Sequence, residues 1–360
     1  MNKFENILIV AGGTGGHVFP AYSLANFFKT EKKKVHLVTD ERGYRYLKDY
    51  NINDLIIINS ETIFHKNPFK ILYSILLIIK AFIISSFTLF KKKPDLVIGM
   101  GGYLSFPVCI SAFILRRPIV LYENNSLIGK TNKLLSFISK RILTSFPEVK
   151  GISQKNKNKV SYVGNIIRDE FLNYNHTLPN ISNSKLNILV LGGSQAAKVF
   201  AEKLPSIFYE LKKISDIKIS QQCLIEQESF LTSFYTEKKI DFNIFNFSSD
   251  LISYFKQCDL VITRSGSSAL AELINCNIPF IAIPLPSSTD NHQLENAKYF
   301  EKNGVNFLIE QNEIDTKLFS LIKLILEDKS LLSHMMKKQK GYSDKNVYKN
   351  FIKEIESITL

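Results

Sequence analysis

The stretch NILIVAGGTGGHVFP, residues 6–20, decides the fold. Its apolar residues Ile7–Val10 do not alternate with polar ones, which is typical of a strand buried on both faces of a parallel sheet. The glycine-rich run Gly12–Gly16 follows at once and predicts a tight turn. A helix is predicted over Ala21–Lys29, with Pro20 at its start. Such a turn lets a phosphate or a sugar approach the backbone and the first turn of the next helix.

The same pattern returns in the second half of the chain as LNILVLGGS, residues 186–194. The stretch Asn173–Ser184, rich in Asn, Pro and Ser, is interpreted as a linker between the halves. We therefore predict an α/β protein with two Rossmann-like, doubly wound parallel-sheet domains facing a cleft. Further strands are predicted at Val35–Thr39, Leu55–Ile58, Leu96–Ile98, Ile119–Tyr122, Ile142–Thr144, Ile217–Ile219, Phe242–Phe245, Leu260–Thr263, Phe280–Ile283 and Val305–Ile309.

Composition excludes several classes of protein. The 360 residues are 45% apolar, which is enough for two cores. The formal net charge of +13 comes from scattered lysines, so we expect no nucleic-acid partner but a basic surface suited to anionic lipid. The four cysteines lack metal-ligand spacing, which favours a reducing cytosol. Met1–Glu5 leads directly into the first strand, so no signal peptide is expected.

The chain has three glycine loops in order, Gly12–Gly16, Gly99–Gly102 and Gly192–Ser194, and together they predict a protein that binds phosphate or a sugar. They do not match the usual dinucleotide fingerprint. After the first loop, Val18 stands where that fingerprint needs its last glycine. Asp40 does end the second strand, where a ribose-binding acid would lie, so a nicotinamide dehydrogenase stays open as an alternative. No glycine run continues into the Gly-Lys-Ser/Thr of a P-loop.

Seven motifs occur in an order that strongly resembles the MurG family. They are Ala11–Pro20, Gly99–Tyr103, Tyr122–Asn125, Thr131–Lys133, Gly164–Arg168, Leu191–Gln195 and Arg264–Gly266. The resemblance covers essentially the whole chain. It implies a GT-B fold and an inverting transfer of N-acetylglucosamine from UDP-N-acetylglucosamine to the muramoyl 4-hydroxyl of lipid I, an undecaprenyl-linked acceptor, giving lipid II in peptidoglycan synthesis.

The resemblance also implies an organisation and a location. Residues 1–164 would form the acceptor- and membrane-facing domain, and residues 165–343 would bind the UDP-sugar. The final helix, within residues 344–360, would pack back on the first domain. The enzyme would be a peripheral protein of the cytoplasmic membrane face that needs no cofactor and has other cell-wall synthesis proteins as partners.

Carried over by position, the resemblance implies a set of substrate-binding residues. Arg168 would pair with the pyrophosphate, Glu272 would accept the ribose hydroxyls, and Ser248 takes a position beside the uracil that is often apolar in the family. The third loop departs from the family's Ser-Gln-Gly-Ala by carrying Ala196. The full set is Thr14, Gly15, Gly16, Asn125, Arg168, Ser194, Ser248, Glu272 and Gln293.

Two residues are candidates for the general base that removes the proton of the acceptor hydroxyl. His17 lies at the mouth of the first loop, and histidine ordinarily titrates near neutral pH; it could instead hold the loop or bind the acceptor. Glu123 is the alternative base, although a carboxylate after a strand is often a helix cap. The chain contains no D-x-D sequence, so no metal site is predicted.

The apolar stretch Phe69–Phe90 is almost long enough to span a bilayer. Lys80 near its centre opposes spanning, and a polar stripe at helical spacing includes Ser74 and Ser85. We interpret the stretch as a helix packed on the sheet whose outer face, beside Lys66 and Lys91–Lys93, enters the lipid interface. An ordinary buried helix is the alternative.

Other functions remain open on the sequence alone. A UDP-N-acetylglucosamine 2-epimerase has the same GT-B architecture. A protein that binds a lipid-linked sugar without turning it over is another alternative, which turnover by the purified protein would exclude.

Overall fold

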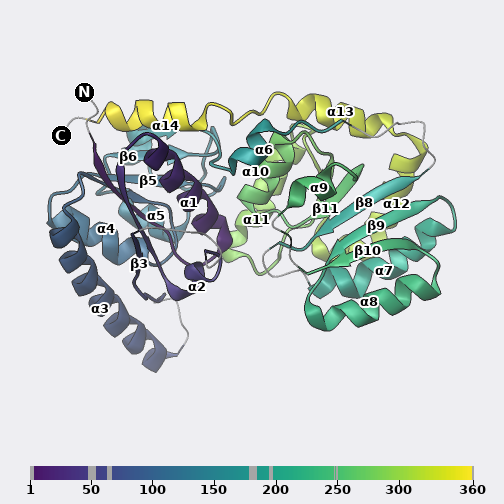
Figure 1. The fold of residues 1–360 in the computed structure, drawn as a ribbon, viewed down its shortest axis with the longest axis horizontal. Coiled ribbons are helices and arrows are strands. Elements are labelled where there is room, and N and C mark those ends of the chain that lie inside the picture. Colours follow the sequence, from purple (N-terminus) through teal and green to yellow (C-terminus); the bar gives the residue numbers. More distant parts are fainter. Residues whose placement is uncertain are drawn as a thin grey trace. The chain divides into compact units, whose positions relative to one another are not determined.

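The chain forms two compact units, each built around one parallel sheet (Figure 1). The computed structural model describes residues 4–47, 54–62, 67–177, 185–193, 198–246, 248 and 250–358. Unit 1 comprises Met1–Arg168 with Asp344–Leu360, and unit 2 comprises Asp169–Ser343. The chain leaves unit 1 after Arg168, ahead of the predicted linker, of which residues 178–184 lie outside the described part.

Unit 1 contains a seven-stranded sheet in the order β3-β2-β1-β4-β5-β6-β7. Its strands are β1 (Asn6–Val10), β2 (Lys34–Thr39), β3 (Leu55–Ile57), β4 (Leu96–Gly99), β5 (Ile119–Glu123), β6 (Arg141–Thr144) and β7 (Val160–Tyr162). Its α-helices are α1 (Gly15–Thr30), α2 (Glu41–Tyr44), α3 (Pro68–Lys92), α4 (Ser105–Ile114), α5 (Lys130–Leu135) and α14 (Val347–Glu356).

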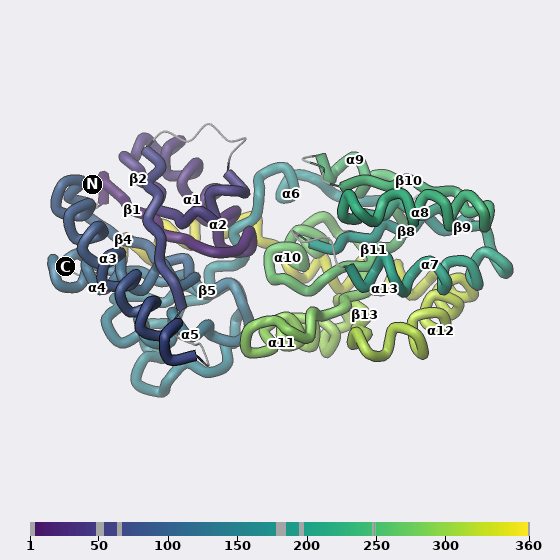
Figure 2. The backbone as a smooth tube through the Cα atoms, turned by 90° about the horizontal axis from the view of Figure 1, so that it is seen from below, coloured from purple at the N-terminus to yellow at the C-terminus, as the bar shows by residue number. Residues whose placement is uncertain are grey.

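The unbroken apolar run of β1 is buried on both sides, as predicted. Ile7 and Ile9 pack into one cluster with α1 and with Phe351 of α14. Leu8 and Val10 point the other way, into a cluster with α4 and the inner side of α3. Figure 2 shows α3 running beside α4 in this unit. Because successive strand residues face opposite sides, only a continuous apolar run fills both layers.

Helix α1 begins earlier than predicted, at Gly15, so Pro20 lies inside the helix and not at its start. Proline has no N–H and cannot bond to the carbonyl four residues before it, which is that of Gly16. That carbonyl instead accepts a hydrogen bond of 2.7 Å from the side-chain amide of Asn124, at the end of β5. The helix therefore tolerates Pro20 because a side chain takes the place of the missing donor.

Unit 2 contains a six-stranded sheet in the order β10-β9-β8-β11-β12-β13. Its strands are β8 (Leu186–Leu191), β9 (Ile217–Gln222), β10 (Asp241–Phe245), β11 (Leu260–Thr263), β12 (Phe280–Ala282) and β13 (Phe307–Leu308). Its α-helices are α6 (Asp169–Asn173), α7 (Lys198–Lys212), α8 (Ile225–Glu237), α9 (Leu251–Phe255), α10 (Ser267–Asn275), α11 (His292–Glu301), α12 (Ile314–Glu327) and α13 (Ser330–Gln339).

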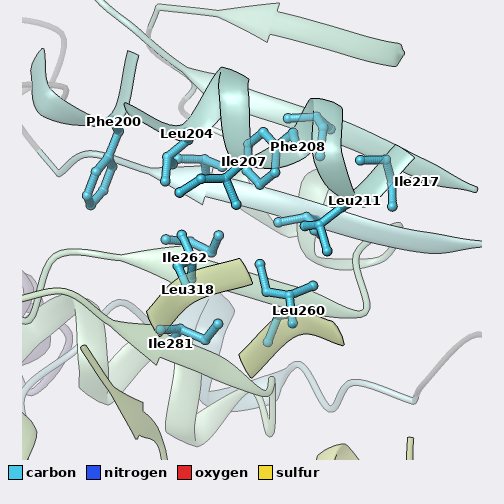
Figure 3. Close-up of a cluster of buried hydrophobic side chains, with 14 of the residues drawn as sticks. Phe200, Leu204, Ile207, Phe208, Leu211, Ile217, Leu260, Ile262, Ile281 and Leu318 are labelled. Atoms are coloured by element: carbon cyan, nitrogen blue, oxygen red, sulfur yellow. The ribbon is translucent and has the colours of Figure 1, made fainter. Parts of the chain in front are cut away.

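One face of the second sheet is covered by α7 and α12. Figure 3 shows Leu204 and Phe208 of α7 directed toward Leu260 and Ile262 of β11, with Leu318 of α12 in the same cluster. All five side chains are fully buried. The sheet is therefore held by a continuous apolar core, which fixes the loops at its carboxyl edge.

A polar bridge joins the two central strands at the amino-terminal edge of each sheet. In unit 1 the Asp95 carboxylate, just before β4, accepts a hydrogen bond of 2.9 Å from the N–H of Asn6 at the start of β1. In unit 2 Asp259, just before β11, accepts from the N–H and the side-chain amide of Asn187 at 2.8 and 2.9 Å. The two halves thus repeat a local structure as well as a sequence pattern.

Candidate functional site

Two of the predicted glycine loops meet in unit 1. They follow β1 and β4, the neighbouring strands at which the strand order reverses, and ligands of such sheets bind at this point. The Cα of Gly102 lies so close to Gly12 that an added Cβ would come within 2.4 Å of the Gly12 carbonyl oxygen. A side chain at 102 would separate the loops, so glycine is required there for their contact.

The Asp40 carboxylate stabilises the first glycine loop through hydrogen bonds. Its Oδ1 accepts hydrogen bonds from the N–H of Gly13 (2.9 Å) and of Gly43 (2.8 Å), and its Oδ2 pairs with Arg42 at 2.9 Å. The side chain is buried. Both oxygens therefore already have partners within the protein. This weakens the interpretation of Asp40 as a ribose-binding acid, on which the dehydrogenase alternative depends.

His17 lies in the first turns of α1, with its imidazole against the second glycine loop. An added Cβ on Gly101 would come within 2.9 Å of its Cε1 and 3.0 Å of its Nδ1. Thr14 is the N-cap of this helix, and Gly15 and Gly16 form its first turn. The predicted residues Thr14, Gly15, Gly16 and His17 are thus together at the carboxyl edge of β1 and β4.

Glu123, the alternative base, ends β5 and is buried. One of its oxygens accepts from the backbone and side-chain N–H groups of Asn125 at 3.0 and 3.2 Å. The other accepts from the Gly129 N–H at 3.0 Å and from the Asn132 amide at 2.9 Å. Burial raises the pKa of Glu123, and these four donors act in the opposite direction. The contacts give Glu123 a role in fixing the position of Asn125.

Asn125 and Arg168 complete the part of the candidate site in unit 1. Asn125 is half-buried, and its amide also donates to Asn124 at 2.8 Å, so it lies in the loop that is tied to α1 through Gly16. Arg168 is half-buried as well, and its guanidinium carbon lies 6.0 Å from the centre of the Phe19 ring on α1. That distance allows a cation–π contact, which places Arg168 beside the same helix as His17.

The part of the site in unit 2 also lies at a reversal of strand order, between β8 and β11. The Gly192 N–H after β8 donates to the side chain of Gln222 at 3.1 Å. Gly266 after β11 is the N-cap of α10. Ser194, predicted to bind phosphate, lies outside the described residues.

Arg264 comes from one of the motifs, and its contacts are structural. Its guanidinium donates to the carbonyls of Ile283 (3.2 Å) and Pro284 (3.1 Å) and to the side chain of Gln311 (2.7 Å). It also lies 4.7 Å from the centre of the Phe200 ring. Burial lowers the pKa of the Arg264 guanidinium to about 10. The residue therefore fastens the ends of β11 and β12 to α7.

The remaining predicted residues of unit 2 lie on elements that follow β10, β11 and β12. Ser248 precedes α9, and its hydroxyl accepts from the Asp250 N–H at 3.1 Å. Glu272 is half-buried on α10. Gln293 is in the first turn of α11, where its side-chain oxygen accepts from the Leu285 N–H at 3.0 Å. All three elements begin at the carboxyl edge of the sheet.

Helix α3 exposes most of its large apolar residues, and the residues that it buries are mostly small. Phe69, Ile83, Phe87 and Phe90 are 81, 61, 68 and 69% exposed. The inner side instead carries Ser74, Ala81, Ser85 and Leu89. The two serines of the predicted polar stripe thus face inward, because small side chains let α3 approach α4 closely. An ordinary buried helix would not expose so many large apolar side chains, so that alternative interpretation of α3 is wrong.

Several residues that organise the candidate site have only a weak signal in the sequence. Asn124 is part of the motif Tyr122–Asn125, and its hydrogen bond to Gly16 could be suspected only from the donor that Pro20 removes. The role of Asp40 in stabilising the first glycine loop is harder to predict, because the sequence shows only a carboxylate at the end of a strand. The bond between Glu123 and Asn132 joins residues that only the fold brings together.

Comparisons with known proteins agree with this arrangement. Residues 7–144 match the glycosyltransferase family 28 N-terminal domain, and residues 187–353 match the C-terminal domain of that family. The UDP-N-acetylglucosamine--N-acetylmuramyl-(pentapeptide) pyrophosphoryl-undecaprenol N-acetylglucosamine transferase of Pelagibacter ubique is 37% identical, with 99% of each chain covered. The counterpart from Rickettsia canadensis is 32% identical, covering 98% of this chain and 99% of its own.

A solved structure gives the same result. The crystal structure of MurG from Acinetobacter baumannii matches with a TM-score of 0.77 at 25% identity, covering 98% of this chain and 99% of that one. The two parallel sheets with this likeness establish the predicted GT-B fold. The chain therefore belongs to the MurG family of N-acetylglucosamine transferases, within glycosyltransferase family 28.

Proposed function

We propose that the protein transfers N-acetylglucosamine from UDP-N-acetylglucosamine to the muramoyl 4-hydroxyl of lipid I, giving lipid II. The observation that carries this proposal is the 37% identity to a curated transferase of that name over 99% of both chains. The geometry supports it, since the described candidate residues of each unit lie on loops and helices that follow strands of its parallel sheet, and ligands of such sheets bind at the carboxyl ends of the strands.

In the proposed reaction the acceptor oxygen attacks the anomeric carbon of the sugar. A C–O bond forms as the bond between that carbon and the phosphate oxygen breaks, and the electron pair leaves with UDP. His17 takes the proton of the acceptor hydroxyl. Arg168 and the N-terminus of α10, whose cap is Gly266, stabilise the charge that grows on the pyrophosphate.

The donor-binding roles follow from residue chemistry. Glu272 offers two carboxylate oxygens to the ribose hydroxyls. At the sugar, Asn125 can accept through its amide oxygen and Gln293 can donate through its amide nitrogen. Thr14, Gly15 and Gly16 present backbone N–H groups at the start of α1. Ser194 would offer its hydroxyl to phosphate, and Ser248 would lie beside the uracil.

The proposed function predicts which ligands bind and which product forms. Calorimetry should show binding of UDP and UDP-N-acetylglucosamine and none of NAD, because Asp40 is already engaged by Gly13, Gly43 and Arg42. With a short-chain lipid I analogue, the purified protein should release UDP and form the disaccharide lipid. Conversion of the sugar nucleotide without an acceptor would indicate an epimerase. Binding of the lipid-linked sugar without turnover would leave a binding protein.

The exposed side of α3 fits the surface of an anionic membrane. Together with Phe113 and Ile114 of α4, which are 54 and 60% exposed, it forms an apolar surface. Exposed basic residues lie on α3 or just after the ends of α3 and α4, namely Lys70, Lys80, Lys91, Lys93 and Arg116. Apolar area that enters the interface and cations that meet anionic headgroups are the two requirements for peripheral binding. The protein would thus work as a peripheral protein at the cytoplasmic membrane face, where its lipid-linked acceptor lies.

Helix α3 is long enough to cross a bilayer by length and composition. It nevertheless connects two strands of one sheet, β3 and β4, and rests on α4 through its small residues. We therefore place it in the plane of the interface and not across the membrane. Lys80 is exposed and would reach back toward the headgroups.

Polar substitution of the outer side of α3 should abolish most membrane binding without unfolding the protein. Ile75, Leu76, Ile79 and Ile83 are 42–61% exposed, so changing all four to Gln removes little core packing. Affinity for liposomes containing anionic lipid should fall at least about ten-fold, since each buried aliphatic side chain contributes about 1.5–3 kcal/mol. Liposome sedimentation at low salt measures this.

A matched control changes exposed apolar residues of unit 2. Ile214, Ile225 and Leu324 are 52, 77 and 50% exposed, and their replacement by Gln should leave liposome binding unchanged. Equal losses in both variants would mean that general apolarity, and not α3, drives binding. A folded wild-type protein that never binds anionic liposomes would end the proposal for this surface.

A further inference from the structure

The segment Val163–Ile167, which leads directly to Arg168, belongs to no helix or strand. Its buried N–H and C=O groups therefore need partners from elsewhere. Tyr122 of β5 supplies two, since its hydroxyl donates to the Gly164 carbonyl at 3.1 Å and accepts from the Ile166 N–H at 2.9 Å. Burial raises the pKa of Tyr122 well above its ordinary value, so the hydroxyl keeps the proton it donates.

The Thr144 carbonyl of β6 accepts from the N–H groups of Val163 and Gly164, and the returning C-terminal segment supplies three further partners. Asp344, the first residue of unit 1 after the return, accepts a hydrogen bond of 2.7 Å from the Asn165 N–H. In α14, the Tyr348 hydroxyl donates to the Ile167 carbonyl at 3.2 Å, and the Asn350 amide donates to the Val163 carbonyl at 3.2 Å. Residues far apart in sequence thus make hydrogen bonds to every residue of this short segment.

Among the three side chains of the returning segment that bond to Val163–Ile167, that of Asp344 is the most buried. It is 6% exposed, and an added Cβ on Gly164 would come within 2.6 Å of its Oδ1. Gly164 also has φ of +101°, a conformation that side chains disfavour. Glycine at 164 and aspartate at 344 therefore form one local structure, in which the carboxylate takes the space that a side chain would need.

We propose that Asp344 is a positioning residue for Arg168: by fixing the backbone of Gly164–Ile167, it holds the guanidinium where the leaving pyrophosphate is stabilised. This inference rests on the proposed function, which gives Arg168 that role. Arg168 follows the fixed segment directly, so these hydrogen bonds determine where its main chain begins. Its guanidinium carbon lies 6.0 Å from the centre of the Phe19 ring. A displacement of about 1 Å in such a group can lower a rate by about 10²-fold.

Asp344→Ala in the full-length protein should lower kcat about ten-fold and change the KM for UDP-N-acetylglucosamine less than about two-fold. In an Arg168→Ala background it should have no further effect on kcat, because the group that it positions is gone. Asp344→Asn keeps an oxygen acceptor for the Asn165 N–H and should recover most of the rate. Additive losses in the double variant, or an unchanged kcat in a folded Asp344→Ala protein, would overturn the proposal.

Asp95 provides the matched control. It too accepts backbone N–H groups in unit 1, from Glu5 at 3.2 Å and Asn6 at 2.9 Å, but at the edge of the sheet opposite the candidate site. Asp95→Ala should lower Tm, as Asp344→Ala does, and leave kcat unchanged. A fall in kcat as large as that of Asp344→Ala would show that lost stability, and not positioning, explains both variants.

Two further measurements keep the proposal testable. If Asp344→Ala does not fold, Tyr348→Phe removes one hydroxyl while keeping the ring stacked on Phe27 at 4.4 Å. It should lower kcat about two- to three-fold, a loss of one modest hydrogen bond, and an unchanged kcat would count against positioning. Amide hydrogen exchange needs no substrate: unchanged exchange at Asn165 and Ile166 in a folded Asp344 variant overturns the positioning role alone, whereas absence of transfer by the wild-type protein overturns the proposed function.

Discussion

His17→Ala should lower kcat by about 10²–10⁴-fold while the affinity for UDP-N-acetylglucosamine barely changes, as expected for loss of a general base. The imidazole lies against Gly101, between the two glycine loops at the carboxyl edge of β1 and β4. In the proposed reaction it contacts the acceptor hydroxyl and not the nucleotide. Its removal should therefore affect the transition state far more than donor binding.

Single-turnover transfer rates and calorimetry with UDP separate the two effects. His334, which is exposed on α13, gives a control: His334→Ala should leave both quantities unchanged. A modest loss of kcat together with weaker donor and acceptor binding would assign His17 to holding the loop. Glu123→Gln should unfold or loosen the loop around Asn125, because its new NH₂ group would face N–H donors.

Gly101→Ala offers an independent approach to the same side chain. The added methyl group would come within 2.9 Å of the His17 ring, at a residue whose φ is +91°. We expect it to displace the imidazole and to reproduce part of the rate loss, although residue 17 is still a histidine. A fully active Gly101→Ala protein would argue that the exact position of the ring does not matter for catalysis.

The central strands were predictable because their apolar runs are continuous or nearly so. Leu186–Leu191 and Leu260–Thr263 have the predicted bounds, since both are central strands buried on both faces. Strand β7 was missed: Val160–Tyr162 lies at the edge of its sheet and is partly exposed, and its alternation of apolar and polar residues covers only three positions, too few to predict a strand.

Other errors come from partners that the linear sequence does not reveal. Proline is a reliable helix-start signal on its own, and it failed at Pro20 only because Asn124 satisfies the carbonyl of Gly16. Asp40 resembled a ribose-binding acid until the fold placed Gly13 and Gly43 within reach of its carboxylate. Helical spacing showed that α3 has two sides, but not that the serine side faces α4.

Arg168→Ala should lower kcat about 10²–10³-fold, the usual effect of removing one preorganised donor from a developing negative charge. Charge on the pyrophosphate grows as the bond to the sugar breaks, so the guanidinium contributes most in the transition state. Arg168→Lys should recover little, because an ammonium group cannot make the paired N–H contacts of guanidinium.

Glu272→Ala makes the informative comparison, because ribose contacts persist from the bound substrate to the transition state. It should weaken UDP binding about ten-fold, the effect of losing a charge-assisted hydrogen bond, and change kcat little. Calorimetry with UDP and steady-state kinetics with the lipid acceptor measure both variants. If Arg168→Ala weakened UDP binding as much as it lowered kcat, the guanidinium would be a ground-state contact. Its place beside Phe19 would then serve donor affinity and not departure of the leaving group.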